Sequence, residues 1–418
     1  MRIGVDMLAA QSAGCSRGTG RYIRALLPEL LHASSHECFL YYHGGLAQQA
    51  PHEYANERVL PAEASLHLGV ERLLRTNADN LDVLLLSCPL ENFEGYLPPF
   101  PRRGRARLAA IVYDLIPLRF PQHYLRHPAI ADAYRRALAA VRQYDLLLTI
   151  SESSRQEVIR ALRVPEARVV TIGAGSDADC FYPSPSRSVE SDRHLSQLGI
   201  HKPYLYALTA LDYRKNFAGL LAALEQLSPS VLDGHQFVIT CASAGDDELR
   251  QARDAIDRSP VAPCVVLTGK VNDEQLRTLY QHALAFVFPS RYEGFGLPLV
   301  EAMQCGAPVV GGRNSSQIEV VGDAGLLADV DDSTDLANTI SRVLTDRQLA
   351  MQLRSRGIER ARQFTWSAVA DRCARALESM AEQPRRSTWF GTLTARGTLF
   401  VAARRKDRNV PHVMRTTA

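Results

Sequence analysis

The sequence predicts an α/β protein with two Rossmann-like domains, whose parallel sheets face a cleft between them. Strand-like apolar runs alternate with helical segments in both halves of the chain, as is typical of a parallel sheet. A polar stretch at residues 183–197, with little periodic hydrophobicity, separates the two series. The 418 residues, 46% of them hydrophobic, are enough for two cores.

The first domain is predicted over residues 1–190. It opens with a strand at residues 3–5 and a loop containing Gly14, Gly18 and Gly20, followed by a helix that begins near Arg21. Further strands are expected at residues 81–86, 108–112, 146–150 and 169–172, with helices at 129–141 and 153–162.

The second domain is predicted over residues 198–365 and repeats this alternation. Its strands are expected at residues 204–208, 236–240, 264–267, 285–288 and 308–310. Ligands of open α/β sheets bind beyond the carboxyl ends of the strands, so the loops after strands are the candidate sites in both domains.

The most informative segment, residues 289–310, reads as a loop, a short helix and a strand. Gly294 and Gly296 let the backbone approach a ligand closely, and Pro298 suits the first turn of a helix. Gly306 is the expected left-handed terminator of that helix, and Pro308 prevents its resumption. The exposed helix start is suited to phosphate and sugar hydroxyls.

Two carboxylates flank that helix start. Glu301 lies about one turn into the helix, where it can accept from both hydroxyls of a ribose. Glu293 follows the strand end. If a diphosphate binds at the helix start, Glu293 points at the group attached beyond it. The segment therefore has the features of a sugar-nucleotide site.

The whole string resembles the signature of retaining GT-B glycosyltransferases, specifically glycosyltransferase family 4, and the resemblance covers residues 1–380. It implies a GT-B fold in which Glu293 contacts the transferred sugar and Glu301 the nucleotide ribose. It also makes Phe295, Gly296 and Leu297 donor-binding residues. Residues 366–382 resemble the closing helix of the family, which crosses back onto the first domain.

Arg214 and Lys215 follow the first strand of the second half, directly before a helix. Arg214 can bind a diphosphate bidentately and Lys215 as a point charge, which would neutralise the leaving group. The segment resembles the family's diphosphate site, although many members carry another arginine where this chain has Thr209 and Ala210. Ordinary surface charges at a helix start are the alternative.

Two weaker motifs extend the predicted donor site. Gly18 and Gly20 resemble the N-terminal glycine loop with which family members approach the donor diphosphate, and a structural turn is the alternative. Lys270 and Val271 resemble the strand end whose backbone reads the nucleobase, and a plain strand-to-turn transition is equally compatible.

Tyr113 and Asp114 follow the strand at 108–112 and resemble the H-D-L-x-P segment of related transferases, some of them mannosyltransferases. Tyr113 stands where histidine is usual, so its hydroxyl either takes over the histidine's role or leaves it unfilled. Asp114 is expected to bind an acceptor hydroxyl or only to cap its loop.

Neither a metal nor a cofactor is expected. The pairs at 177–179 and 329–331 match the D-x-D pattern by which another glycosyltransferase fold holds divalent metal, but the cations and the helix start already satisfy the diphosphate. Eight scattered cysteines argue against zinc and against a disulfide framework. The net charge of +3 gives no support for nucleic-acid binding.

Residues 384–418 interleave aromatic and aliphatic side chains with arginine and lysine. This basic amphipathic tail is expected to contact an anionic membrane, with a disordered or domain-packing tail as the alternative. The chain shows no signal-peptide pattern and no long apolar run, so a cytoplasmic enzyme, peripheral at the inner face of the membrane, is expected.

The resemblance implies a retaining, metal-independent hexosyltransferase acting on a glycan or lipid-linked acceptor, as in bacterial surface polysaccharide or glycolipid synthesis. GDP-mannose is the favoured donor, with UDP-glucose or a deoxyhexose donor next. A nicotinamide-dependent oxidoreductase is one rival, although the chain lacks a clean G-x-G-x-x-G with its ribose-binding acid. A non-catalytic GT-B binding protein is the other.

Overall fold

The computed structural model describes residues 1–11, 18–33, 36–46, 56–62, 66–91, 96–101, 106–184, 186–241 and 245–384. Met1–Gln383 form one compact unit. The predicted amphipathic tail lies almost wholly outside the described residues. Within the described ranges, no helix is both long and apolar enough to cross a bilayer.

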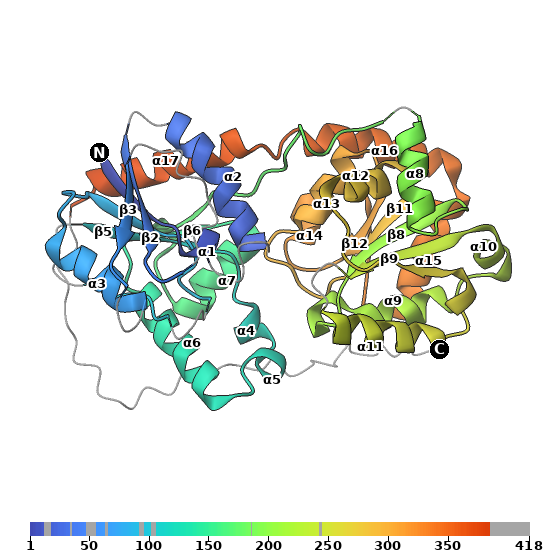
Figure 1. Ribbon diagram of the computed structural model, residues 1–418, viewed down its shortest axis with the longest axis horizontal. Helices are drawn as coiled ribbons and strands as arrows, with labels where there is room; N and C mark the ends of the chain where they lie inside the picture. The colour runs from blue at the N-terminus through green and yellow to red at the C-terminus, as the bar shows by residue number, and fades with distance from the viewer. Residues whose placement is uncertain are drawn as a thin grey trace, which may run out of the picture. The chain divides into compact units, whose positions relative to one another are not determined.

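The first half of the chain forms a parallel seven-stranded sheet (Figure 1, blue to green). Its strands are β1 (Arg2–Asp6), β2 (Glu37–His43), β3 (Glu57–Leu60), β4 (Val83–Leu86), β5 (Arg107–Val112), β6 (Leu146–Thr149) and β7 (Val169–Thr171). The helices of this half are α1 (Leu8–Gln11), α2 (Gly18–Ala33), α3 (Leu66–Thr76), α4 (Ile116–Arg119), α5 (Pro121–Tyr124), α6 (Pro128–Val141) and α7 (Glu152–Leu162).

The second half forms a parallel six-stranded sheet (Figure 1, green to orange). Its strands are β8 (Tyr204–Thr209), β9 (Gln236–Cys241), β10 (Val265–Leu267), β11 (Ala285–Phe288), β12 (Val309–Gly312) and β13 (Leu326–Ala328). The helices are α8 (Val189–Gln197), α9 (Phe217–Leu224), α10 (Pro229–Gly234), α11 (Asp246–Asp257), α12 (Asp273–His282), α13 (Leu297–Gln304), α14 (Gln317–Val321), α15 (Ser333–Thr345), α16 (Arg347–Ala361) and α17 (Trp366–Glu382).

Both sheets reverse their strand order beside their first strand. The orders are β3-β2-β1-β4-β5-β6-β7 and β10-β9-β8-β11-β12-β13, so the reversal falls between β1 and β4 and between β8 and β11. Such a switch point opens a crevice at the carboxyl ends of the two strands, because their connections leave toward opposite faces of the sheet. The predicted α/β fold class with two parallel sheets is confirmed.

The inner strands are buried on both faces, which is why their sequences read as continuous apolar runs rather than alternating patterns, whereas the edge strands β3, β7, β10 and β13 are only partly buried. Every predicted strand is present within a residue or two of its expected bounds. The predictions omitted β2, β3 and β13. Strands β3 and β13 are short and lie at sheet edges, whereas β2 is an apolar run that could have been recognised.

One helix at the domain boundary was not predicted, and one local prediction is corrected. The polar stretch at 183–197, expected to separate the two domains, contains α8, whose start is fixed by a capping box between Ser188 and Ser191. Helix α2 begins at Gly18 rather than near Arg21. Gly18 and Gly20 therefore lie in the first turn of a helix and not in a loop, while Gly14 lies outside the described residues.

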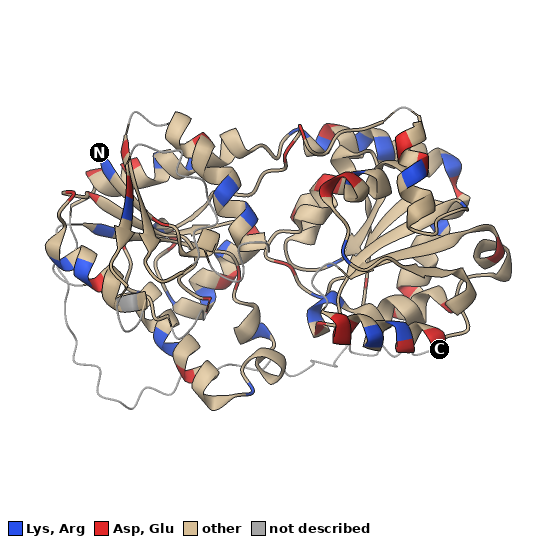
Figure 2. Ribbon diagram, viewed as in Figure 1, with Lys and Arg blue, Asp and Glu red and all other residues tan. Residues whose placement is uncertain are grey.

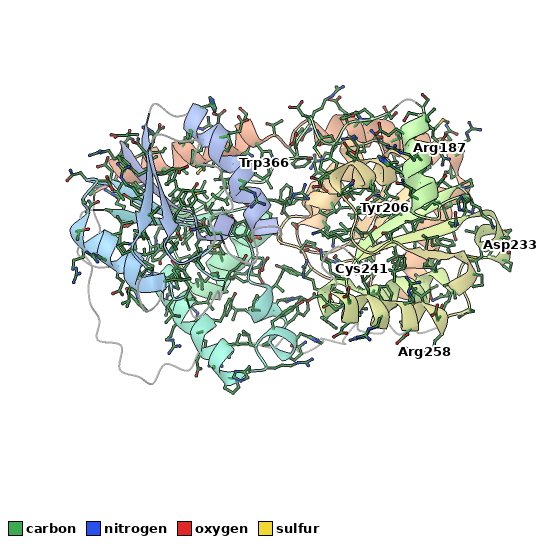
Figure 3. The ribbon with its side chains drawn as sticks, in the orientation of Figure 1. Arg187, Tyr206, Asp233, Cys241, Arg258 and Trp366 are labelled. Carbon is green, nitrogen blue, oxygen red and sulfur yellow. The ribbon has the colours of Figure 1, made fainter. Side chains whose placement is uncertain are left out.

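Helix α17 packs against α2 and β6 of the first half. Trp366, labelled in Figure 3, meets the Tyr22 ring edge-on at 4.9 Å between centroids. Arg372 Nε donates to the carbonyl of Ile172 at 2.7 Å, and His36 contacts Glu378 at the same distance. The chain thus forms the second sheet and then returns to the first.

Candidate active site

The switch point of the second sheet brings two loops together. Arg214 and Lys215 follow β8, and Glu293 follows its neighbour β11. The Glu293 carboxylate accepts from both cations, with Arg214 Nη1 at 2.5 Å from Oε2 and Lys215 Nζ at 2.7 Å from Oε1. Three residues from two separate sequence motifs therefore form one charged cluster.

Burial and charge act in opposite directions on this cluster. Burial disfavours the charged form of Glu293, but Arg214 and Lys215 outweigh it and hold the pKa of that carboxyl below its ordinary value. Burial and the nearby Arg214 lower the pKa of Lys215, and Glu293 opposes that shift. The carboxylate thus holds two cations next to each other.

The backbone of Glu293 is fixed by serines that follow β12. Glu293 N–H donates to Ser315 Oγ at 3.0 Å. The Ser316 hydroxyl lies 2.9 Å from the carbonyl oxygen of Glu293 and 2.8 Å from that of Phe295, and donates to them. These bonds tie the loop between β11 and α13 to the segment that follows β12.

Gly294 lets the first half approach this loop. A Cβ on Gly294 would lie 2.6 Å from the carbonyl oxygen of Tyr113, closer than such atoms approach. Ser154 Oγ, at the start of α7, donates to the carbonyls of Tyr113 at 2.9 Å and Gly294 at 3.2 Å. The Tyr113–Asp114 segment is therefore held directly against the Glu293 loop.

Asp114 caps its own loop, since Oδ1 accepts the N–H of Ile116 at 2.9 Å. Burial raises the pKa of Asp114, while this N–H and Arg214 act against the rise. Asp114 thus makes the expected loop-capping hydrogen bond, and its carboxylate also interacts with the charge of Arg214. The Tyr113 hydroxyl is directed to the carbonyl oxygen of Thr19, 3.5 Å away, and burial raises its pKa.

Helix α13 follows the predicted backbone pattern, but its start is not exposed as expected, because Gly296 is buried and Leu297 and Pro298 are half-buried. Pro298 is in its first turn, Gly296 before it has φ +103°, and Gly306 after it has φ +82°. Leu297 opens the helix, and Phe295 packs edge-on against Phe364 at 5.7 Å between centroids.

Glu301 lies in α13 with only 8% of its surface exposed. The Tyr280 hydroxyl donates to Oε2 at 3.3 Å, and Tyr206, labelled in Figure 3, lies close enough for the charges to interact. Burial raises the pKa of Glu301, and the charge of Arg21 at the start of α2 partly offsets that rise. The glutamate therefore has a cation of the first half for a neighbour.

The two weaker motifs are placed around these groups. Gly18 is exposed and Gly20 is buried in the first turn of α2, next to Arg21. Lys270 is exposed and Val271 half-buried in the turn between β10 and α12. That turn lies just before Asp273, which is 3.8 Å from Arg21.

The D-x-D pairs have other partners. The Asp331 carboxylate binds Arg291 Nε at 2.6 Å. Asp177 Oδ1 accepts the N–H groups of Asp179 and Cys180 at 2.9 and 3.2 Å. Both pairs thus bind groups of the protein itself.

Several site residues were not predicted from the sequence. Arg21, Ser154 and the serines 315 and 316 act through contacts between distant segments, and their residue types are common on any surface. Tyr292 is another, because its hydroxyl donates to Glu157 of the first half at 2.8 Å. Its place directly before Glu293 was the available signal.

Solved structures share this fold. Sucrose-phosphate synthase from Thermosynechococcus elongatus aligns with a TM-score of 0.69 and 19% identity over 91% of this chain and 99% of that chain. HepE of Anabaena, in complex with UDP-glucose, aligns with a TM-score of 0.68 and 19% identity over 91% of this chain and 100% of that chain. The architecture is thus the GT-B fold.

Sequence similarity places the chain more narrowly. Residues 190–364 match the family model of the glycosyl transferases group 1. The O-antigen chain mannosyltransferase B of Escherichia coli is 30% identical over 361 residues, which cover 84% of this chain and 92% of that protein. The chain belongs to the group 1 glycosyltransferases.

Proposed function

We propose that this glycosyltransferase is a retaining family 4 enzyme that transfers mannose from GDP-mannose to a hydroxyl of a glycan or lipid-linked acceptor. The observation that carries the proposal is the buried cluster of Arg214, Lys215 and Glu293 at the switch point of the second sheet. Mannose is favoured because the relative from Escherichia coli is named as a mannosyltransferase of an O-antigen chain. The same name supports surface polysaccharide synthesis as the pathway.

In the proposed reaction the two cations bind the donor diphosphate. The bond between the anomeric carbon and the phosphate oxygen breaks, and a bond from that carbon to the acceptor oxygen forms on the same face. The acceptor proton passes to the leaving phosphate oxygen, so GDP and the mannosylated acceptor are the products. Arg214 and Lys215 stabilise the charge that develops on the leaving group, which is why no metal is required.

Glu293 and Glu301 have different tasks. Glu293 loses part of its ion pairing when the diphosphate engages the cations, and its carboxylate then orients the sugar and stabilises positive charge at the reacting carbon. Glu301 accepts hydrogen bonds from the ribose hydroxyls. Asp114, held beside Arg214, is assigned to the acceptor hydroxyl.

Two alternatives concern the donor. The neighbour HepE was solved with UDP-glucose, which supports UDP-glucose as the second candidate. A deoxyhexose donor is the third. Membership of the group 1 family speaks against the nicotinamide-dependent oxidoreductase.

A thermal-shift panel tests the donor. The panel contains GDP, UDP, dTDP, NAD and their sugar conjugates, with and without EDTA, because a ligand that binds only the folded state raises the melting temperature. We expect a response to GDP and GDP-mannose that EDTA does not change and that Glu301→Ala abolishes. Stabilisation by NAD alone, or by none of these ligands, would refute the proposal.

Turnover separates an enzyme from a binding protein. Incubation of GDP-mannose with the full chain is expected to release GDP and to mannosylate an α-mannoside acceptor. Binding of GDP-mannose without release of GDP would favour the non-catalytic alternative.

We further propose that the enzyme acts at the cytoplasmic face of the membrane, which its basic tail contacts.

A further inference from the structure

A cavity of about 290 Å³ is lined by residues that directly precede members of the charged cluster. Arg119 and Phe120, at the end of α4, line it from the first half. Tyr213, Arg291, Tyr292 and Asp331 are among the residues that line it from the second half. Its volume is at the lower end of the range of about 300–1,000 Å³ for small-molecule sites, which suits a single sugar ring.

Two residues that line the cavity are chain neighbours of the charged cluster. Tyr213 directly precedes Arg214, and Tyr292 directly precedes Glu293. Arg214 Nη1 also donates to the carbonyl of Tyr292 at 3.3 Å. A ligand in the cavity is therefore within one residue of the cluster along two different loops.

One wall of the cavity is aromatic and rigid. The Phe120 ring meets Tyr213 and Tyr292 edge-on, at 5.5 and 6.2 Å between centroids. Tyr213 is itself fixed by the stacked ring of His123 at 3.7 Å and by the Arg291 guanidinium at 4.6 Å. The polarised C–H groups of a sugar ring pack well on such faces, since the π face is negative.

The other walls are polar, but their charges are largely paired. Arg291 binds Asp331 at 2.6 Å, and Arg313 contacts Asp335 at 3.4 Å. Asp329, which also lines the cavity, would repel an anion. The lining thus holds three arginines as donors and two aspartates as acceptors, and two of the arginines are already paired, which suits the hydroxyls of a neutral sugar.

We propose that this cavity is an acceptor subsite, which holds one neutral sugar unit of the acceptor glycan against Phe120. The inference rests on the proposed function, because it takes the acceptor to be a saccharide. It assigns Phe120 as a determinant of acceptor specificity that contacts neither the donor nor the transferred sugar.

The test is acceptor length. Methyl α-mannoside and the corresponding di- and trisaccharides are offered to the full chain with GDP-mannose, and kcat/KM is measured for each. We expect kcat/KM to rise about tenfold when the added sugar reaches the subsite, and Phe120→Ala to abolish that gain. The KM for GDP-mannose and the melting-temperature shift with GDP should not change in the variant.

Phe100→Ala is the matched control. Phe100 is also a phenylalanine of the first half, is 45% exposed and does not line the cavity. This variant should keep the dependence on acceptor length. A trisaccharide whose extra unit is a hexuronate should show no gain in the native enzyme.

Three results would overturn the inference. They are equal losses for short and long acceptors in Phe120→Ala, no dependence on length in the native enzyme, and a preference for the hexuronate. In each case a retained GDP response and release of GDP would leave the proposed function standing. Absence of that response would instead refute the proposed function, and the acceptor subsite with it.

Discussion

Glu293 is the residue whose ionisation the site depends on most. Its carboxylate compensates two cations that are each only about one-fifth exposed, at 20% and 21%. Removing one partner of such a cluster leaves uncompensated charge in a poorly solvated place.

Glu293→Gln is therefore expected to lower the free energy of unfolding by about 2–4 kcal/mol and turnover at least about 100-fold. Because the folded-state pKa of Glu293 is lowered, its stabilising contribution is present above the ordinary glutamate pKa and is lost as the pH falls below it. Urea titrations of native and variant protein should therefore converge in acid. A variant as stable as the native protein at pH 7 would contradict this account.

Glu301 presents the opposite case. Its folded-state pKa is raised, mainly by burial, so the unfolded chain releases this proton more readily and stability decreases as the pH rises through the interval between the two pKa values. The ionised carboxylate thus weakens the fold.

Glu301→Gln should accordingly raise the melting temperature of the ligand-free protein near pH 7.5. The difference should disappear below the ordinary glutamate pKa, where the native side chain is protonated in both states. The melting-temperature shift with GDP should be lost, because an amide replaces one of the two accepting oxygens. A variant that is less stable at pH 7.5 would show that pairing with Arg21 outweighs burial.

Among the elements, the loop between β11 and α13 packs closely against the segment that follows β5. The carbonyl oxygen of Tyr113 occupies the space that a side chain on Gly294 would need. The loop cannot move away easily, because Ser315 and Ser316 hold it from the other side.

Gly294→Ala is expected to cost about 1–3 kcal/mol of stability through overpacking. It should also reduce turnover, because the strain would displace Glu293, which directly precedes it. Gly234→Ala is the control, since a Cβ there meets nothing within 4 Å and the residue ends α10. Chemical denaturation and steady-state kinetics of both variants would decide the matter. Unchanged stability in Gly294→Ala would mean that the two loops do not hold this separation in solution.

The helix start of α13 was predictable and its surroundings were not. Pro298 and Gly306 define the helix through their own backbone preferences, which act locally. The pairing of Glu293 with Arg214 and Lys215 depends on β8 and β11 being neighbours in the sheet. No local preference specifies that neighbourhood.

For the whole molecule, contacts between the two halves use charged and polar groups of both. Glu319 of α14 accepts the N–H groups of Glu152 and Ser153 at the start of α7, both at 3.0 Å, and Tyr124 donates to Asp212 at 2.6 Å. Figure 2 shows acidic and basic residues interspersed along the helices of the second half, such as α11. The net charge of +3 fits such mixing.

The tail prediction belongs at this scale. Since Met1–Gln383 form a compact unit of their own, a chain that ends at Gln383 should keep its melting temperature and its response to GDP. Co-sedimentation with vesicles containing anionic lipid should decrease strongly, and added salt should weaken the binding of the full chain. Equal sedimentation of both chains would contradict a membrane role for residues 384–418.

The sequence by itself determined most of the elements, because apolar runs, glycines and prolines act on the chain near them. It also identified Glu293, Glu301, Arg214 and Lys215 as the chemically informative residues. The tertiary structure decided which of them touch, which cation of the first half faces Glu301, and where the aromatic cavity lies. These depend on strand order and on contacts between segments far apart in the chain, which no short-range pattern encodes.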